Sequence, residues 1–276
     1  MERRHDRQGG AMSGVLRSGA RPEGGVTSKV PQVTLAFWII KLLATTVGET
    51  GGDALSMTLG LGYAVASLIY LAFFGITLAT QVASSRYRPL AYWAVVVATT
   101  TVGTTVSDFL DRSVGLGYVK SSIALSCGVL LVLALWRHVT GRIEFQNIVT
   151  KKDEIFYWLT ILVSNTLGTA LGDFVATTSG LGFEGGALVF AGLLAVVAVG
   201  HFLVKRIPSS ALFWAAYVLT RPLGATLGDT LTKPHAQGGL ELGRISSSLS
   251  MAALMIVGIA LVSWKTARRA SPSASA

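Results

Sequence analysis

Four short segments that end in aspartate contain the residues of this sequence best suited to bind a ligand. The first reads TTVGETGGD and places Glu49 and Asp53 inside an otherwise apolar run. The others are TTVGTTVSD at 100–108, NTLGTALGD at 165–173 and RPLGATLGD at 221–229. Hard cations such as Mg²⁺, Ca²⁺ and Mn²⁺ prefer oxygen donors, and monovalent cations can use the same groups. We therefore predict a cation site with these ligands: Asp53, Asp108, Asp173, Asp229 and Glu49.

Hydroxyl groups accompany the carboxylates along each segment. Residues three, four and seven apart share one face of a helix, which predicts a supporting polar stripe formed by Thr46, Thr50, Thr101, Thr105, Thr166, Thr169 and Thr226. The fourth segment has Arg221 where the others have threonine or asparagine. An unpaired guanidinium inside an apolar helix would be unfavourable. We expect Arg221 to neutralise one acidic group and so to tune the charge of the site.

The segments also contain glycines and follow tryptophans at a constant spacing. Each motif glycine lies five residues before its aspartate, at Gly48, Gly103, Gly168 and Gly224. Such small residues let helices approach closely, so helix packing is their expected role. Ten residues before these glycines lie Trp38, Trp93, Trp158 and Trp214, which we predict to be anchors at a membrane interface. Lys41, a turn beyond Trp38, is expected to extend to the same interface, with pairing to Glu49 as an alternative.

The constant spacing indicates four tandem repeats. Their predicted boundaries are 31–86, 87–144, 145–207 and 208–266, with a disordered basic tail at 1–30 and a disordered C-terminal tail at 267–276. Three repeats continue from the aspartate into the tripeptide GLG, whereas the fourth has KPHAQGGLELG in its place.

Composition indicates a membrane protein. Of the 276 residues, 51% are hydrophobic and only 13% are charged, where a soluble domain would have about a quarter charged. Apolar stretches of about 20 residues, the length that a spanning helix needs, cover roughly 33–57, 63–83, 90–110, 118–136, 155–176, 183–204, 211–231 and 245–264. We predict an all-α membrane protein with eight transmembrane helices, two for each repeat.

The positions of the basic residues predict the orientation. Arginine and lysine are concentrated before the first span and after the even-numbered ones, whereas the opposite loops hold little beyond Arg112, Lys120, Lys233 and Arg244. The positive-inside rule then places both termini in the cytoplasm. All four repeats enter from the same side, so we expect parallel helical hairpins in a quasi-fourfold ring or a pair of pairs, in a bacterial inner membrane.

The tryptophan, glycine and aspartate pattern, with two spans in each repeat, resembles a bacterial family of integral membrane proteins built from four tandem repeats of unknown function. The resemblance covers residues 31–265 and implies the fold and the number of repeats. It implies no activity.

From the residues we expect a membrane transporter or channel for a cation, either a divalent metal or a proton-coupled monovalent ion. A non-transporting scaffold or sensor, in which the aspartates cap or connect helices, is the alternative. An intramembrane aspartyl protease is the least favoured reading, because none of the four segments has the Gly-x-Gly-Asp spacing, and we do not expect an enzyme. The expected partners are the lipid bilayer and an inorganic cation, with no nucleic acid and no cofactor beyond the bound cation; the oligomeric state stays open.

Overall fold

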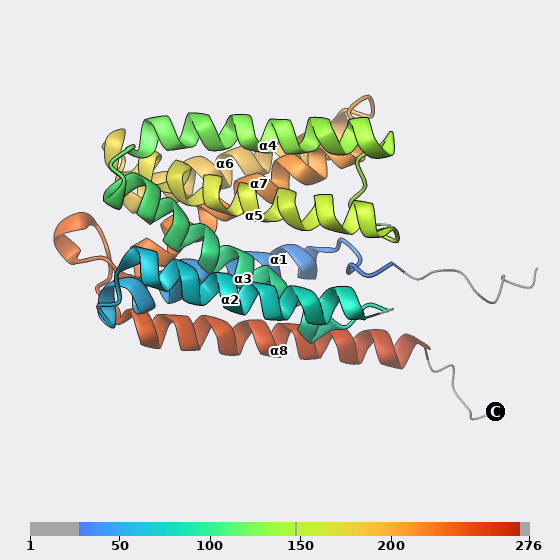
Figure 1. Ribbon diagram of the computed structural model, residues 1–276, viewed down its shortest axis with the longest axis horizontal. Helices are drawn as coiled ribbons and strands as arrows, with labels where there is room; N and C mark the ends of the chain where they lie inside the picture. Colours follow the sequence, from blue (N-terminus) through green and yellow to red (C-terminus); the bar gives the residue numbers. More distant parts are fainter. Residues whose placement is uncertain (1–27, 85, 147, 271–276) are drawn as a thin grey trace, which may run out of the picture.

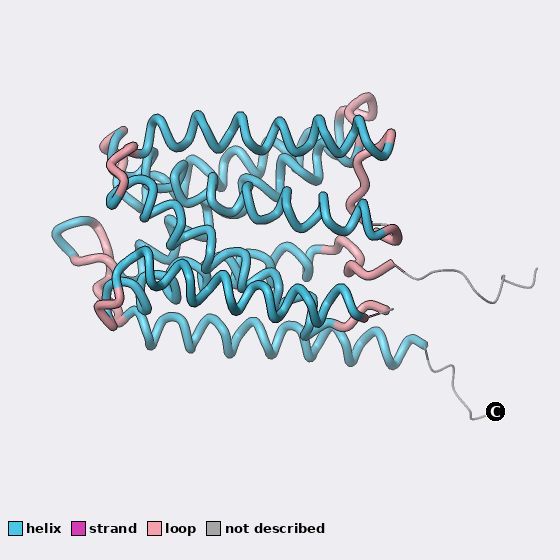
Figure 2. The backbone as a smooth tube through the Cα atoms, viewed as in Figure 1, coloured by secondary structure: helices cyan, strands magenta, loops and turns pink. Residues whose placement is uncertain are grey.

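The computed structural model describes residues 28–84, 86–146 and 148–270, and all regular secondary structure in this part of the chain is helical (Figure 1, Figure 2). The α-helices are α1 (Leu35–Asp53), α2 (Gly62–Ala83), α3 (Pro89–Asp108), α4 (Tyr118–Thr140), α5 (Lys151–Asp173), α6 (Gly182–Leu203), α7 (Ser209–Thr232) and α8 (Arg244–Ala270). Short π-helices follow three of them, η1 (Ala54–Thr58), η2 (Phe109–Ser113) and η3 (Phe174–Thr178), and a 3-10 turn, η4 (His235–Gln237), lies between α7 and α8.

The predicted tails fall largely outside these residues, at 1–27 and 271–276. Where the structure does describe them, they are ordered. Nζ of Lys29 lies 2.9 Å from Oε2 of Glu154, and Val30 is buried. At the other end, α8 continues past the predicted repeat boundary at residue 266 to Ala270.

The odd-numbered helices form a closed inner ring. Helix α1 packs against α3, α3 against α5, α5 against α7, and α7 against α1. Each even-numbered helix packs on the outside of the following odd-numbered one: α2 on α3, α4 on α5, α6 on α7, and α8 on α1. The sequence predicted helical hairpins, but the two helices of a repeat do not pack tightly against each other. The second helix of each repeat instead packs on the first helix of the next repeat, and the contact of α8 with α1 closes the ring.

The motif glycines make the contacts within the inner ring. Each faces the first residue of the next nine-residue segment around the ring: Gly48 faces Thr100, Gly103 faces Asn165, Gly168 faces Arg221 and Gly224 faces Thr45. A Cβ atom at Gly48 would lie 2.2 Å from Oγ1 of Thr100, and one at Gly103 would lie 2.8 Å from a backbone carbon of Asn165. The neighbouring helices are thus too close for any side chain at these positions.

The first three aspartates mark the ends of their α-helices. Five residues in π-helical geometry follow Asp53, Asp108 and Asp173, and the GLG turns come next. Both glycines of the first turn have positive φ, 68° at Gly60 and 72° at Gly62, a conformation that glycine adopts without steric cost. The fourth repeat has no such turn, because α7 continues beyond its aspartate to Thr232. Single π-turns within helices are frequent at functional sites.

Six of the eight helices, α2, α3, α4, α5, α6 and α8, are long and apolar enough to cross a membrane, which is consistent with a multi-pass membrane protein. The prediction of eight spans included α1 and α7, which fall short of this hydropathy because they carry charged residues. Both belong to the inner ring. The outer helices expose large apolar side chains, such as Leu130 on α4 and Leu188 on α6, whereas the inner helices bury hydroxyl and charged groups. This arrangement, apolar outside and polar inside, suits a lipid environment.

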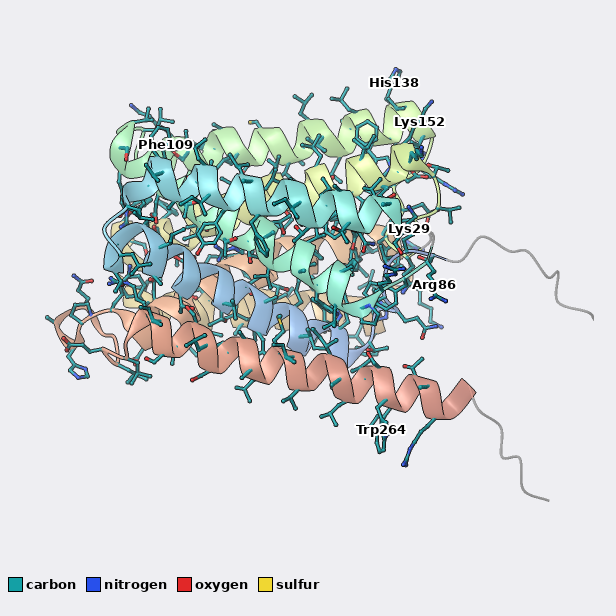
Figure 3. The ribbon with its side chains drawn as sticks, turned by 60° about the horizontal axis from the view of Figure 1, so that its bottom comes forward. Lys29, Arg86, Phe109, His138, Lys152 and Trp264 are labelled. Atoms are coloured by element: carbon teal, nitrogen blue, oxygen red, sulfur yellow. The ribbon has the colours of Figure 1, made fainter. Side chains whose placement is uncertain are left out.

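The two ends of the bundle differ. Figure 3 shows Lys29, Arg86, His138 and Lys152 together at one end, while Phe109, the first residue of η2, lies at the other. The motif aspartates lie at or near the ends of the inner helices at the Phe109 end, and the motif tryptophans lie in their first turns at the basic end.

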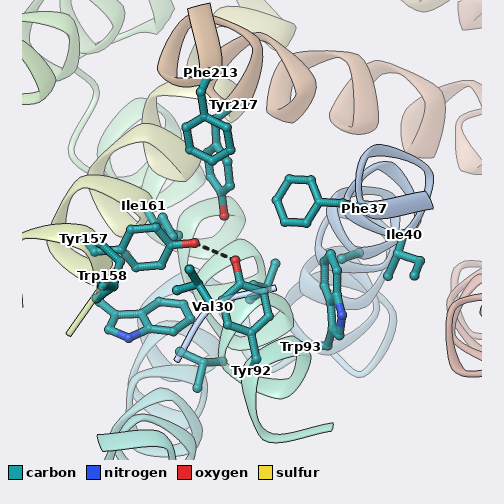
Figure 4. Close-up of a cluster of buried hydrophobic side chains, with 14 of the residues drawn as sticks. Val30, Phe37, Ile40, Tyr92, Trp93, Tyr157, Trp158, Ile161, Phe213 and Tyr217 are labelled. Carbon is teal, nitrogen blue, oxygen red and sulfur yellow. Dashed lines mark hydrogen bonds between the residues drawn. The ribbon is translucent and has the colours of Figure 1, made fainter. Parts of the chain in front are cut away.

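The aromatic residues of the repeats form an internal cluster at the basic end (Figure 4). Tyr92 and Tyr157 meet through their hydroxyl groups at 2.6 Å, as the dashed line shows. Trp93, Trp158 and Trp214 are each at most 4% exposed. These three side chains pack inside the protein and do not face lipid, which corrects their prediction as interface anchors. Trp38 alone among the four motif tryptophans is partly exposed.

Candidate functional site

The guanidinium group of Arg221 lies at the centre of the inner ring. Its Nη2 atom is 2.9 Å from Oε2 of Glu49. The same nitrogen is 2.6 Å from Oγ1 of Thr104 and 2.7 Å from Oγ1 of Thr169. The partners belong to α1, α3 and α5, and Arg221 belongs to α7. One buried group thus connects all four inner helices and closes the axis of the ring.

The glycine of the neighbouring repeat makes room for this arginine. A Cβ atom at Gly168 would lie 2.3 Å from Cγ of Arg221. The other repeats have a shorter threonine or asparagine at the corresponding position. The longer arginine side chain continues past this contact to reach Glu49, the acidic group that it pairs with.

The four motif aspartates lie at one end of the ring and divide into two ion-paired clusters. In the first, Nζ of Lys233 is 3.0 Å from Oδ1 of Asp229 and 3.1 Å from Oδ2 of Asp53. Nε of Arg244 lies 3.5 Å from the same oxygen of Asp53. Burial would lower the pKa of the Lys233 ammonium, but Asp229 and Asp53 raise that pKa above its ordinary value. Lys233 therefore stays charged.

Arg112 organises the second cluster. Its Nε atom is 3.2 Å from Oδ1 of Asp108, and its Nη2 atom is 3.4 Å from Oδ2 of Asp173. Two tyrosine hydroxyls accept further hydrogen bonds from this arginine, at 2.9 Å for Tyr63 and 3.3 Å for Tyr118. The aspartates were predicted as ligands of one cation site, within a quasi-fourfold ring or a pair of pairs. The structure places them as a pair of pairs, each bridged by one basic side chain.

Glu49 pairs with Arg221 and also lies close to two of the motif aspartates. Oxygen atoms of Glu49, Asp53 and Asp229 lie within 4.8 Å of one another, a grouping that could hold a metal ion. All three residues are buried, and their hard oxygen donors fit Mg²⁺, Ca²⁺ or Mn²⁺. The ammonium of Lys233 contacts both aspartates of this group. A lysine side chain thus supplies the positive charge next to the carboxylates.

Most threonines of the predicted polar stripe form hydrogen bonds with the backbone of their own helix. The hydroxyls of Thr46, Thr50, Thr101, Thr105, Thr166 and Thr226 donate to the carbonyl four residues earlier. Only Thr169 of the predicted set contacts the central arginine. Its counterpart on α3 is Thr104, where the prediction had chosen Thr105. The register of the repeat gives the reason: Glu49, Thr104 and Thr169 each follow the motif glycine directly.

The basic partners of the aspartates were the main omission from the sequence-based site. Arg112 and Lys233 had been considered only as loop charges. Each lies four residues after a motif aspartate, at the spacing that places two side chains on the same helix face. That spacing could have identified the pairs Asp108–Arg112 and Asp229–Lys233.

Lys41 lies inside the bundle and not at an interface. Its exposed fraction is 0%. Its Nζ atom lies 3.9 Å from the ring centroid of Tyr217, and it has no hydrogen-bond partner among the described residues. It also makes no ion pair with Glu49, which is taken by Arg221. Both interpretations of Lys41 from the sequence are therefore wrong.

The fold and the site define an all-helical protein of four tandem repeats with a buried charge network along the axis of its inner ring. The model of one protein family, described as Repeat of Unknown Function (DUF347), matches the chain four times, at residues 36–87, 91–141, 156–206 and 212–269. The chain belongs to this family, as the resemblance of its motifs implied. No curated protein and no solved structure matches it significantly.

Proposed function

We propose that this chain is a membrane transporter that carries an inorganic cation, either a divalent metal or a proton-coupled monovalent ion. The observation that supports this best is the grouping of Glu49, Asp53 and Asp229, three buried carboxylates whose oxygens lie within 4.8 Å. Buried carboxylates at membrane depth are costly and usually mark ion pathways or proton relays. This cluster lies at the end of the inner ring, where four repeats converge.

The proposed setting is a bacterial inner membrane crossed by eight helices. In this arrangement α1 and α7 also span the bilayer, with their charged groups shielded inside the quasi-fourfold ring. In this proposal the end that includes Lys29 and Arg86 faces the cytoplasm, and the basic residues gathered there support it through the positive-inside rule. The aspartate clusters then face the outside, and both termini are cytoplasmic.

The closed axis favours a carrier over an open channel. The contacts of Arg221 with Glu49, Thr104 and Thr169 cross the ring below the aspartate clusters. An ion that enters from the aspartate end would therefore stop at Glu49. Passage requires a second arrangement of this layer, and two alternative arrangements of a gate are the basis of carrier mechanisms.

Lys233 acts in this mechanism as a tethered cation. Its ammonium contacts Asp53 and Asp229, so it holds the place of a transported ion. Lys233 begins the loop between α7 and α8, the part of the fourth repeat that differs from the others. When this loop moves away, the carboxylates are free to take an ion. Exchange of one positive charge for another avoids leaving the buried acids unpaired.

Flux measurements in proteoliposomes test the proposal. The purified chain is tested with Mg²⁺, Mn²⁺, Ca²⁺, Na⁺ and K⁺, with and without a pH gradient. We expect flux of at least one cation in the native chain, loss of it in Asp53→Asn and Asp229→Asn, and normal flux in the control Glu184→Gln, an exposed acid at the same end. If no cation moves under any gradient through a correctly folded native chain, the transport proposal is wrong.

A second candidate, a non-transporting scaffold, is favoured by one observation: every motif aspartate has a basic partner. Lys233→Met separates the two candidates. A transport site should bind its cation at least about tenfold more tightly once the competing ammonium is gone, a gain of about 1.4 kcal/mol. If the network is purely structural, Lys233→Met should lower the free energy of unfolding, and no added cation should restore it.

A further inference from the structure

A buried lysine, Lys41, lies deeper in the ring than the aspartates and has no acidic partner among the described residues. Lys41 on α1 reaches the neighbouring helix α7, where its Nζ atom lies 3.9 Å from the ring centroid of Tyr217. The residue is fully buried, and its three N–H donors find no acceptor among the described residues. Contact with an aromatic face is typical of a charged ammonium.

Arg221 adds free donors to the same interior space. Only its Nη2 atom is used in the contacts with Glu49 and the two threonines, while Nε and Nη1 are buried without a hydrogen-bond partner in the described part of the chain. Arg221 lies four residues after Tyr217 on α7, which is one helical turn or about 6 Å along the axis. The aromatic ring that Lys41 contacts and the guanidinium of Arg221 therefore come from adjacent turns of α7.

The charges of this inner layer do not cancel. Glu49 balances Arg221, and the four aspartates are engaged by Arg112, Lys233 and Arg244 at the end of the ring. Lys41 has no acidic partner among the described residues, so a positive charge on its amino group would be uncompensated. Such a charge at membrane depth is unfavourable unless another group pairs with it.

We propose that the unpartnered N–H groups of Lys41 and Arg221 together bind one small monovalent inorganic anion, of which chloride is the simplest example. One negative charge neutralises the layer, and N–H groups on two sides match the donors that such an anion requires.

This anion site is separate from the proposed transport site and does not depend on it. The aspartate clusters could prove structural while the anion still binds, since Lys41 contacts none of the motif aspartates. Binding to the folded chain therefore provides a readout that needs no ion flux.

Thermal unfolding of the full chain in detergent, at constant pH and ionic strength, tests the proposal. Chloride is titrated against gluconate, an anion too large for a fully buried site. We expect the Tm of the native chain to rise with chloride and to saturate, because a ligand that binds only the folded state stabilises it. Bromide and nitrate should act in the same way.

Lys41→Met removes the uncompensated charge and keeps an unbranched apolar side chain. This variant should fold in gluconate at least as well as the native chain, and its Tm should no longer depend on chloride. Lys265→Met on α8, where the lysine is exposed, is the matched control and should keep the native chloride dependence. A native Tm that is equal in chloride, bromide, nitrate and gluconate overturns the proposal, as does an unchanged chloride dependence in Lys41→Met. If Lys41→Met does not fold, bromide located by anomalous diffraction in native crystals decides: its absence between Lys41 and Arg221 also overturns the proposal.

Discussion

Replacing Arg221 with methionine should destabilise the chain more than any other single change in the charge network. Arg221 has a side-chain exposed fraction of 0%, and its partner Glu49 has one of 4%. The variant leaves the Glu49 carboxylate buried without a counter-charge, and it also removes the donor that contacts Thr104 and Thr169. Breaking a buried ion pair from one side typically costs about 3–5 kcal/mol. We expect a loss of that size in the free energy of unfolding.

A double-mutant cycle separates the ion pair from the space that the side chain fills. Glu49→Gln alone leaves the guanidinium unpaired, whereas the combination with Arg221→Met removes both members of the ion pair. The double variant should therefore be more stable than the sum of the two single losses predicts, with a coupling of about 2–3 kcal/mol, at the upper end of values for contacting residues.

The cycle can be followed by tryptophan fluorescence during titration with a denaturing detergent, since Trp93, Trp158 and Trp214 are buried. Arg206→Met, at an exposed loop position, is the control and should change stability by no more than about 0.5 kcal/mol. Strictly additive single losses, or a loss below about 1 kcal/mol for Arg221→Met, would refute the assignment of Arg221 as the group that holds the inner ring together.

Two further predictions concern the packing of the ring. Gly103→Ala should destabilise the chain by about 1–3 kcal/mol, because the new Cβ would lie 2.8 Å from the backbone of α5. The matched Gly75→Ala, which meets no atom within 4 Å on α2, should be neutral or stabilise by up to about 1 kcal/mol; equal effects of the two changes on the Tm would contradict the close approach. Tyr92→Phe removes one hydroxyl of the 2.6 Å contact with Tyr157 and should cost about 1–3 kcal/mol, measured by the same fluorescence titration, because the remaining hydroxyl stays buried without a partner. An unchanged free energy would show that this contact contributes nothing to the aromatic cluster.

The fourth repeat gives the ring its asymmetry. It supplies Arg221 to the central layer and Lys233 to the outer one, and it replaces the π-helix and GLG turn of the other repeats with the loop that follows α7. The first repeat supplies Glu49 and Lys41, which have no equivalents in the other three. The chemically distinct groups thus come from the two repeats that close the circle, at the contact between α7 and α1.

The sequence by itself determined the number of repeats, the helices and the polarity of the site. Four segments with one spacing must form four similar units, and an even number of helices in each unit orients all units alike. The four aspartates therefore had to lie at one end. The glycines also predicted close helix contacts, because a small residue at the same position of every repeat is typical of helix packing in apolar segments.

Only the tertiary structure decided which groups meet. The register of one helix predicts partners four residues apart, such as Asp108 and Arg112, but it cannot show that Arg112 also reaches Asp173 or that Lys233 reaches Asp53. The burial of the tryptophans could not be predicted for a related reason. A helix face that contacts lipid and one that contacts another helix are both apolar, so the sequence does not distinguish them. Which faces meet depends on how the helices of one repeat pack on those of the next, and this packing joins segments far apart in the chain.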